Sequence, residues 1–498
     1  MTSLAHSPRT WLPGPAHTLD RQTLALHLAP HGQEHLARFW DELSGTEKQQ
    51  LGNQIDALDL ALLAELREQG RQLLSSGVDS SAAQAQLFEA LAARATAPPA
   101  MRLDGSGAID RDQALAAGAD LLTRGQVAMI LVAGGLGSRL GFELPKGFYQ
   151  LAPLSQRTLF DILISQLSSV ERRYGQTIPL YIMTSPATDA LTREFLEKNN
   201  YFGKPRTSVR IFCQNVMWAL DEQWNRLLMS SPSSLFLGPD GHGGMLRALA
   251  ESGCLADAEA RGITQIFYGQ IDNPLLQVCS ELLLGSHVLA QSEMTTQVVE
   301  KRHPLERVGN VVEVDGKVQV IEYVDLPESA ARATSADGRL KLWAGNLAVH
   351  VFDTAFLARA NRDQTSLPFH FARKKVPTID DSGAVVEPTS INAIRFERFI
   401  FDLLPAARKS LVVEADPAEA FAPVKNAEHE KTDTAATARA AMIAQARRWL
   451  EAAGAHVAPQ VRVEIHPAFA ATIDEVRARV KPGTVIDRDT YFSPSGAL

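Results

Sequence analysis

Residues 131–141 read LVAGGLGSRLG, and residues 144–147, a few positions later, read LPKG. The apolar run at 127–132, which leads into the glycines, is typical of a buried parallel strand. Glycines at the end of such a strand let the backbone approach a ligand closely, and their N–H groups can bind an anion. Arg139 and Lys146 place positive charge in the same stretch. The sequence therefore predicts a buried strand that ends in a phosphate-binding loop.

Two commoner glycine loops do not match this stretch. The dinucleotide-binding pattern GxGxxG, started at Gly135, requires glycine at the position of Leu140. A Walker A loop started at Gly135 requires Gly-Lys where Leu140 and Gly141 stand. The mismatch at Leu140 disfavours a nicotinamide-dependent oxidoreductase.

Apolar runs of strand length alternate with amphipathic stretches of helix length around and beyond this loop. The expected strands are 127–132, 178–184, 209–213 and 263–271, and the expected helices between them include 159–170 and 188–198. This alternation predicts a doubly wound α/β sheet. Ligands of such sheets bind beyond the carboxyl ends of the strands. We therefore expect the glycine loop, Gln214 and Asp272 to lie at one edge of the sheet, because each directly follows a strand.

The flanking parts of the chain have a different pattern. Residues 16–95 carry leucines near helical spacing among polar residues, and residues 435–453 also predict a helix. Residues 293–323 are richer in strand formers and include a hairpin signal at Gly316.

Composition excludes several classes of protein. The chain of 498 residues carries a formal net charge of −8, which argues against a nucleic-acid-binding surface. Its three cysteines fit neither a disulfide framework nor a zinc site. No window reaches the length of about 20 apolar residues that crosses a membrane, and the N-terminus lacks the pattern of a secretion signal. The cytoplasm is the expected compartment, and the sequence assigns no oligomeric state.

The glycine loop resembles the nucleotide-binding loop of the eukaryotic-type UDP-sugar pyrophosphorylases, above all the UDP-N-acetylglucosamine pyrophosphorylases. The similarity runs from about residue 105 to about residue 450, and further short segments follow in the order of the family. These are YIMTS (181–185), NNYFG (199–203), FCQ (212–214), PDGHGG (239–244), IDN (271–273), VEK (299–301), VIEY (320–323), AGN (344–346) and PVKNA (423–427). So many short matches in one order are hard to explain by chance.

The resemblance implies an α/β protein with a Rossmann-like nucleotidyltransferase core, a helical N-terminal region and a smaller C-terminal domain. With the patterns above, it predicts a helical N-terminal domain over 1–120, a catalytic domain over 121–400 and a C-terminal α/β domain over 401–498. It also implies that a sugar 1-phosphate attacks the α-phosphorus of UTP in the presence of Mg²⁺, or of Mn²⁺ in its place. Chemistry of this kind depends on charge neutralisation and alignment more than on a protein base.

For the phosphates, the resemblance implies one catalytic role for each basic residue. Arg139 would hold the β- and γ-phosphates, which a guanidinium suits because it is a fixed fork of donors. Lys146 would neutralise the α-phosphate, and Lys425 would reach the phosphates from the C-terminal side. Asp272 would bind Mg²⁺ between phosphate oxygens.

For the nucleoside, the resemblance implies contacts from two glycine loops. Gln214 would read uracil, because a side-chain amide both donates and accepts hydrogen bonds. Gly243 would pass under the base. The remaining nucleotide-binding candidates are Gly134, Gly135, Gly137 and His242.

For the sugar, the resemblance implies both polar and aromatic contacts. Glu322 and Asn346 would hydrogen-bond hydroxyl groups, and Gly309 would let the sugar lie against the backbone. Phe399 and Phe401 match the segment that lines an N-acetyl pocket in the family.

The sequence also departs from the family in ways that concern the sugar. His242 stands where the N-acetylglucosamine enzymes usually carry Asn, and enzymes that use plain hexose phosphates often carry His there. The stretch Cys213–Gln214–Asn215 also departs from the double glutamine of the family. N-acetylglucosamine 1-phosphate is the first expected substrate, with glucose or galactose 1-phosphate as the alternative. A non-catalytic UDP-sugar-binding regulator is a further alternative, which retention of the basic residues and Asp272 disfavours.

Overall fold

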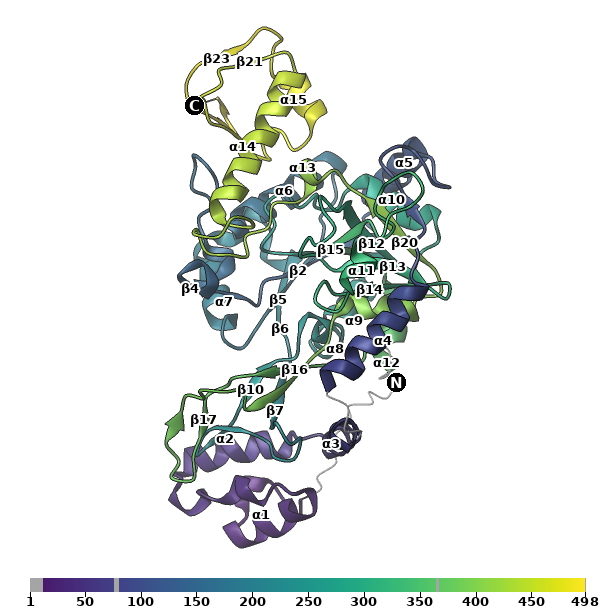
Figure 1. Ribbon diagram of the computed structural model, residues 1–498. Helices are drawn as coiled ribbons and strands as arrows, with labels where there is room; N and C mark the ends of the chain where they lie inside the picture. The colour runs from purple at the N-terminus through teal and green to yellow at the C-terminus, as the bar shows by residue number, and fades with distance from the viewer. Residues whose placement is uncertain (1–11, 76–79, 364–366, 498) are drawn as a thin grey trace. The chain divides into compact units, whose positions relative to one another are not determined.

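The computed structural model describes residues 12–75, 80–363 and 367–497. The contacts within the chain divide it into two compact units (Figure 1). Unit 1 combines residues 1–87, 215–243 and 368–399, and unit 2 combines residues 88–214, 244–367 and 400–498. The predicted boundaries after residues 120 and 400 follow chain order, whereas the contacts join two later segments to the N-terminal helices. The two units group the chain by contacts and do not test the predicted domain boundaries, which stay predictions.

Unit 1 packs helices against a small antiparallel sheet. Its helices are α1 (Arg21–Leu28), α2 (Gly45–Asp56) and α3 (Leu60–Ser75), and its strands follow the order β10 (Leu237–Pro239), β7 (Val216–Asp221), β19 (Ala393–Glu397) and β16 (His370–Lys374). Trp40, Trp218 and Phe396 lie in one buried apolar cluster that joins helices and sheet. The predicted helical character of residues 16–95 is confirmed for the described part of that range. Its last helix is α4 (Ser80–Arg94), which begins in unit 1 and ends in unit 2.

Unit 2 is built on a large mixed sheet. The strand order is β1 (Ala100–Met101), β20 (Ser410–Glu414), β12 (Met294–Glu300), β15 (Ala344–Asp353), β11 (Gln265–Gln270), β2 (Val127–Val132), β5 (Leu180–Thr184) and β6 (Val209–Cys213). Strands β11, β2, β5 and β6 are parallel to one another, as the alternating pattern predicts. The α/β fold class is therefore confirmed.

The sheet differs from the expected parallel arrangement at β15. This strand lies between β11 and β12 and is antiparallel to both. It also pairs with β13 (Asn310–Val314), which forms a hairpin with β14 (Lys317–Ile321) around the predicted turn at Gly316. A buried apolar run does not encode strand direction, because both directions bury the same side chains.

Helices of unit 2 meet the sheet and each other closely. The predicted helices appear as α6 (Leu159–Tyr174) and α7 (Asp189–Lys198). The backbones of α5 (Arg111–Thr123) and α10 (Glu281–Leu289) lie in close contact at Gly118. A Cβ on Gly118 would lie only 2.0 Å from the Glu281 carbonyl oxygen, so this position requires glycine. Among the described residues, no helix has the length and apolarity needed to span a membrane.

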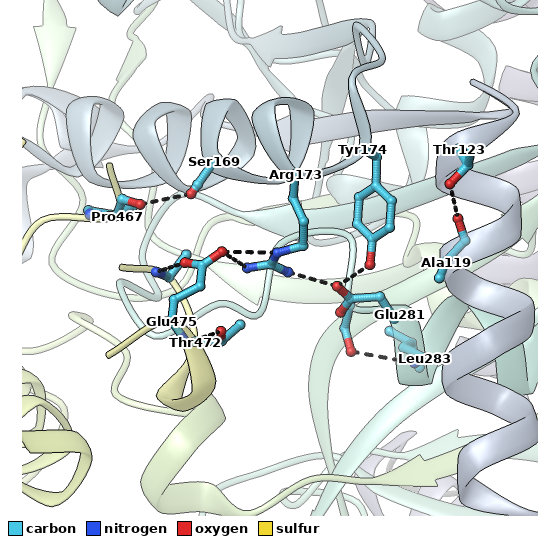
Figure 2. A network of polar contacts seen from close by, with 12 residues as sticks. Ala119, Thr123, Ser169, Arg173, Tyr174, Glu281, Leu283, Pro467, Thr472 and Glu475 are labelled. Carbon is cyan, nitrogen blue, oxygen red and sulfur yellow. Dashed lines mark hydrogen bonds and ion pairs between the residues drawn. The ribbon is translucent and has the colours of Figure 1, made fainter. Parts of the chain in front are cut away.

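The C-terminal part of unit 2 is held to α6 by polar contacts. It contains α14 (Ala435–Ala452), α15 (Ile473–Arg479) and short strands. Figure 2 shows the Arg173 guanidinium between two carboxylates, at 2.7 Å from Glu281 and 2.9 Å from Glu475. Nearby, the Ser169 hydroxyl donates to the Pro467 carbonyl oxygen at 2.9 Å. These bonds fasten the segment after α14 to the helix that follows the glycine loop.

Candidate active site

The glycine loop forms at the carboxyl end of β2. The Lys146 N–H donates to the Gly135 carbonyl oxygen at 3.0 Å, which closes the loop through the hairpin of β3 (Leu136–Gly137) and β4 (Phe142–Pro145). A Cβ on Gly134 would lie 3.2 Å from the Ser185 nitrogen, whereas a Cβ on Gly135 would meet no atom within 4 Å. Gly134 therefore sits close to the neighbouring strand, and the Gly135 backbone borders open space.

The rest of the loop carries the first two basic residues. A Cβ on Gly137 would lie 2.6 Å from the Phe142 carbonyl oxygen, so glycine is needed for the hairpin to close. Arg139 lies in the turn of this hairpin, is exposed, and makes no ion pair with other described residues. An exposed guanidinium beside an open backbone is suited to binding phosphate.

Lys146 and Asp272 meet where β2 and β11 end. The Ile271 N–H donates to the Val132 carbonyl oxygen at 3.0 Å, which holds the two strand ends together. The Lys146 ammonium lies 3.7 Å from a carboxylate oxygen of Asp272, and the two side chains are 17% and 13% exposed. This distance exceeds that of a normal hydrogen bond, so the two charges attract each other without a fixed bond.

The Lys425 segment is fastened to the same strand end. The Val424 N–H donates to the Asp272 carbonyl oxygen at 2.9 Å. The buried Asn273 amide donates to the Ala420 carbonyl oxygen at 2.7 Å and accepts from the Ala422 N–H at 3.0 Å. The structure thus brings Lys425, far away in the sequence, to the end of β11 that carries Asp272.

Asp433 is an acidic residue of this region that sequence reasoning missed. Its carbonyl oxygen accepts from the Lys425 and Asn426 N–H groups at 2.7 and 2.9 Å, and its backbone adopts a left-handed conformation with φ 58°. Burial raises the pKa of Asp433 above its usual value, Lys425 opposes that rise, and the charge of Asp272 adds to it. Its only sequence signal is its position before Thr434, the N-cap of α14.

Gln214 directly follows the last residue of β6, as predicted. Its N–H donates to the Thr184 carbonyl oxygen at 2.9 Å, and the residue is 9% exposed. It therefore lies at the carboxyl end of a parallel strand of the same sheet, as the glycine loop and Asp272 do.

The three predicted polar sugar contacts also come together in unit 2. The Asn346 N–H donates to the Gly309 carbonyl oxygen at 2.8 Å. A Cβ on Gly309 would lie 2.8 Å from a carboxylate oxygen of Glu322, so the absent side chain leaves room for that carboxylate. The β15 ladder shifts register beside Asn346, where Ala348 has φ 55°, and such a bulge re-aims the side chains around it.

The candidates of unit 1 form an aromatic group. The Gly243 N–H donates to the Arg398 carbonyl oxygen at 2.8 Å, and a Cβ on Gly243 would lie 2.8 Å from the Phe399 nitrogen. The His242 and Phe399 rings stack with centroids 5.4 Å apart, and the His370 ring lies 4.6 Å from Phe399. Burial lowers the pKa of His242 to about 4, and the charge of His370 acts in the same direction. His242 is therefore neutral at pH 7.

The two phenylalanines predicted to line one pocket belong to different units. Phe399 lies in unit 1, beside His242, while Phe401 lies in unit 2, where it is 6% exposed in the 3-10 helix Ile400–Ala406.

The arrangement in unit 2 defines a class of protein. A glycine loop, an acidic residue and basic residues gather at the carboxyl ends of parallel strands, as in α/β proteins that bind nucleotides at this edge. The chain thus has the fold of nucleotide-binding α/β proteins, with a glycine loop and charged side chains at the strand ends where such proteins bind their ligands.

Comparison with known proteins identifies the family. Residues 93–482 match the family described as UTP–glucose-1-phosphate uridylyltransferase, and the chain belongs to this family of UDP-sugar pyrophosphorylases. It is therefore a uridylyltransferase.

Individual relatives agree with this assignment. The chain is 36% identical over 436 residues to the UDP-N-acetylhexosamine pyrophosphorylase-like protein 1 of Xenopus tropicalis, covering 85% of this chain and 84% of the relative. It is 36% identical over 356 residues to the UDP-N-acetylglucosamine pyrophosphorylase of Saccharomyces cerevisiae, covering 70% and 74%. The crystal structure of the uridine diphosphate N-acetylglucosamine pyrophosphorylase from Trypanosoma brucei, in complex with an inhibitor, superposes with a TM-score of 0.73 at 25% identity, covering 95% and 99%.

Proposed function

We propose that this protein transfers the uridylyl group of UTP to a sugar 1-phosphate with release of pyrophosphate, and that N-acetylglucosamine 1-phosphate is its preferred acceptor. The observation that carries the proposal is the meeting of Lys146, Asp272 and the Lys425 segment at the ends of β2 and β11. This combination suits a phosphoryl-transfer site, because positive charge must offset the charge that builds on the transferred phosphate while two anions are held together.

In this proposal each basic residue has one task. The phosphate oxygen of the acceptor attacks the α-phosphorus of UTP, and the bond from that phosphorus to the β-phosphate oxygen breaks. Lys146 neutralises the charge that builds on the α-phosphate. Arg139 holds the β- and γ-phosphates as they leave, and Lys425 holds the phosphate of the acceptor. The exposure of Arg139 supports its task, since it is available to bind a phosphate.

The residues present fit a magnesium ion shared between protein and substrate. Asp272 offers a hard oxygen donor that already faces a cation, the Lys146 ammonium at 3.7 Å. Within the described ranges, no cluster of three or more His, Cys, Asp or Glu side chains could hold a metal unaided. One or two carboxylates completed by substrate phosphates and water are the common arrangement for Mg²⁺. We propose that Asp272 would hold Mg²⁺ or Mn²⁺, which when bound would neutralise phosphate charge.

The proposed nucleoside contacts use both glycine loops. Gln214 pairs with the uracil edge, while the Gly134 and Gly135 backbone and Gly137 border the nucleotide. His242 and Gly243 of unit 1 are proposed as further nucleotide contacts. The neutrality of His242 at pH 7 supports a role in stacking or hydrogen bonding rather than in charge pairing.

The proposed sugar preference rests on the relatives and on the aromatic candidates. Relatives in yeast and Trypanosoma brucei are named for UDP-N-acetylglucosamine. An acetamido methyl favours an apolar wall, the role that the resemblance implies for Phe399 and for Phe401. Gly309, Glu322 and Asn346 are proposed to contact hydroxyl groups common to hexoses.

Glucose or galactose 1-phosphate is the second candidate acceptor. His242, which argues for a plain hexose, stacks on Phe399, which argues for the acetamide. The side chain that favours a plain hexose and one of the two that favour the acetamide thus lie in direct contact. Partial turnover of glucose 1-phosphate is expected.

The compartment proposed for the reaction is the cytoplasm. Cys213, Cys254 and Cys279 are all free thiols, which supports a reducing environment.

A pyrophosphate-release assay with the whole protein tests the proposal. UTP and Mg²⁺ are combined with N-acetylglucosamine, glucose or galactose 1-phosphate, and kcat/KM is measured for each. We expect the highest value for N-acetylglucosamine 1-phosphate. A glucose preference above about tenfold, or about 1.4 kcal/mol, would overturn this choice. Binding of UDP-sugar without any release of pyrophosphate would instead identify a non-catalytic regulator.

A further inference from the structure

Unit 2 contains two lysines that are almost completely buried, Lys204 and Lys301, at 4% and 5% exposure. The Lys204 ammonium lies 2.6 Å from a carboxylate oxygen of Glu171, so its charge is paired. Among the described residues Lys301 makes no ion pair, and its ammonium donates to the side-chain oxygen of Asn310 at 2.6 Å. A buried charge without a counter-ion destabilises a fold. The ion pair with Glu171 accounts for the burial of Lys204, whereas the burial of the Lys301 ammonium has no such counter-ion.

The pKa of Lys301 agrees with this geometry. Burial lowers that pKa to about 8, and the charge of Glu306 opposes the shift. Glu306 is itself paired with Arg302 at 2.5 Å. Lys301 thus remains largely protonated at pH 7, with the Asn310 carboxamide as its hydrogen-bond partner.

The Asn310 carboxamide joins the two segments that carry predicted sugar contacts. Its nitrogen donates to the carbonyl oxygens of Val308 and Ile321, each at 3.3 Å. Val308 directly precedes Gly309, and Ile321 directly precedes Glu322. One amide group therefore fixes the backbone next to Gly309 and next to Glu322.

Lys301 determines which way round this amide lies. An ammonium has only donors, so it requires the amide oxygen to face it. The amide nitrogen then faces Val308 and Ile321, and its two hydrogens match the two carbonyl oxygens. With the amide reversed, nitrogen would face the ammonium and oxygen would face two other oxygens.

The stem of Lys301 also lies against the segment that carries the third sugar contact. A Cβ on Gly345 would lie 3.5 Å from Cγ of Lys301, and Gly345 directly precedes Asn346. The Asn346 N–H in turn donates to Gly309. Lys301 and Asn310 thus contact all three segments that present the predicted polar contacts.

We propose that Lys301 and Asn310 are positioning residues for the sugar phosphate: the ammonium orients the amide, and the amide sets the spacing of Gly309 and Glu322. Neither residue is assigned a contact with substrate. The inference rests on the proposed function, because it takes Gly309, Glu322 and Asn346 as the residues that contact the sugar.

The test compares Lys301→Met with Lys204→Met, which removes the other buried ammonium. For each variant, kcat and the KM values for UTP and for N-acetylglucosamine 1-phosphate are measured, together with thermal unfolding. We expect Lys301→Met to raise the KM for the sugar phosphate about tenfold and to leave the KM for UTP within about twofold, because only the sugar contacts lose their spacing. Lys204→Met is expected to lower Tm without changing the ratio of the two KM values.

A second variant keeps the test decisive if Lys301→Met does not fold. Asn310→Ala removes the amide while keeping the ammonium, and we expect the same selective rise in KM. In the double variant the two effects are expected to be non-additive, since both act through one hydrogen bond. Equal changes in both KM values, or additive effects, would overturn the inference. Absence of turnover in the unmodified protein would instead reject the proposed function, so the two failures are distinguishable.

Discussion

The proposed phosphate region and the proposed sugar region of unit 2 differ in how their polar side chains are held. The phosphate region comprises Lys146, Asp272 and Lys425, whose charges are partly exposed and whose closest ion pair spans 3.7 Å. The sugar region is fixed by short hydrogen bonds, including 2.6 Å between Lys301 and Asn310 and 2.8 Å between Asn346 and Gly309. The proposed phosphate region thus offers charged side chains without a short ion pair, whereas polar groups of the proposed sugar region are joined by direct hydrogen bonds.

This difference agrees with what each region is proposed to recognise. Phosphates carry charge that changes during the reaction, so loosely paired lysines can move from a carboxylate to a substrate oxygen. A sugar is neutral and differs from its isomers only in the direction of its hydroxyl groups. Recognition of hydroxyls requires fixed partners, because a misplaced hydrogen bond leaves polar groups unpaired. Substitutions in the phosphate region should therefore lower turnover, and substitutions in the sugar region should raise KM.

Loss of the Lys146 charge should have the largest effect. We expect Lys146→Ala to lower kcat/KM by at least about 100-fold, the order seen when a group that stabilises transition-state charge is removed. Lys198→Ala, which removes an exposed lysine at the end of α7, serves as the control and should leave kcat/KM unchanged. Steady-state kinetics of folded variants check the prediction, and near-normal turnover of Lys146→Ala would refute the proposed role.

Loss of the Asp272 charge should act on the metal requirement. Asp272→Asn keeps the shape of the side chain and should raise the Mg²⁺ concentration for half-maximal activity about tenfold or more, because a charged oxygen ligand is lost. Chelation of divalent ions should abolish turnover of the unmodified protein. A magnesium titration of Asp272→Asn beside Asp112→Asn, an exposed aspartate in α5, measures the shift. Coinciding titration curves would show that the metal binds elsewhere.

A change at Gly309 should have the smallest effect and should appear in KM. The new Cβ of Gly309→Ala would lie 2.8 Å from a Glu322 carboxylate oxygen and 2.9 Å from Val320 Cγ1. The Glu322 carboxylate ends a flexible side chain and should be displaced, whereas the stiffer Val320 side chain must shift slightly as a whole, so the fold should persist. We expect the KM for the sugar phosphate to rise about fivefold, equivalent to about 1 kcal/mol, with little change in kcat.

The matched control for Gly309→Ala is Gly45→Ala, where a Cβ would meet no atom within 4 Å. Kinetics of both variants separate the effect on the sugar from the effect of an added methyl group. An unchanged sugar KM in Gly309→Ala would contradict the placement of Glu322 in the sugar site.

Sequence alone determined the elements that local pattern encodes. The strand at 127–132 and the strand at 209–213 have the bounds that the sequence predicts, because each is a short run that ends at glycine or polar residues. The glycine loop, Gln214 and Asp272 were placed at one edge of the sheet because each follows a parallel strand. The resemblance to the UDP-sugar pyrophosphorylases supplied the family, which the comparisons confirm.

Only the tertiary structure decided the direction of β15, the division into units, and the partners of the buried charges. An apolar strand buries the same side chains in either direction, so the antiparallel placement of β15 is invisible in its composition. Asp433 carries no local pattern, and the VEK segment that contains Lys301 does not reveal the buried partner of that lysine, because both roles depend on groups that the fold brings beside them. Local periodicity depends on residues that are neighbours in the sequence, whereas the environment of a charge depends on the distant segments that pack against it.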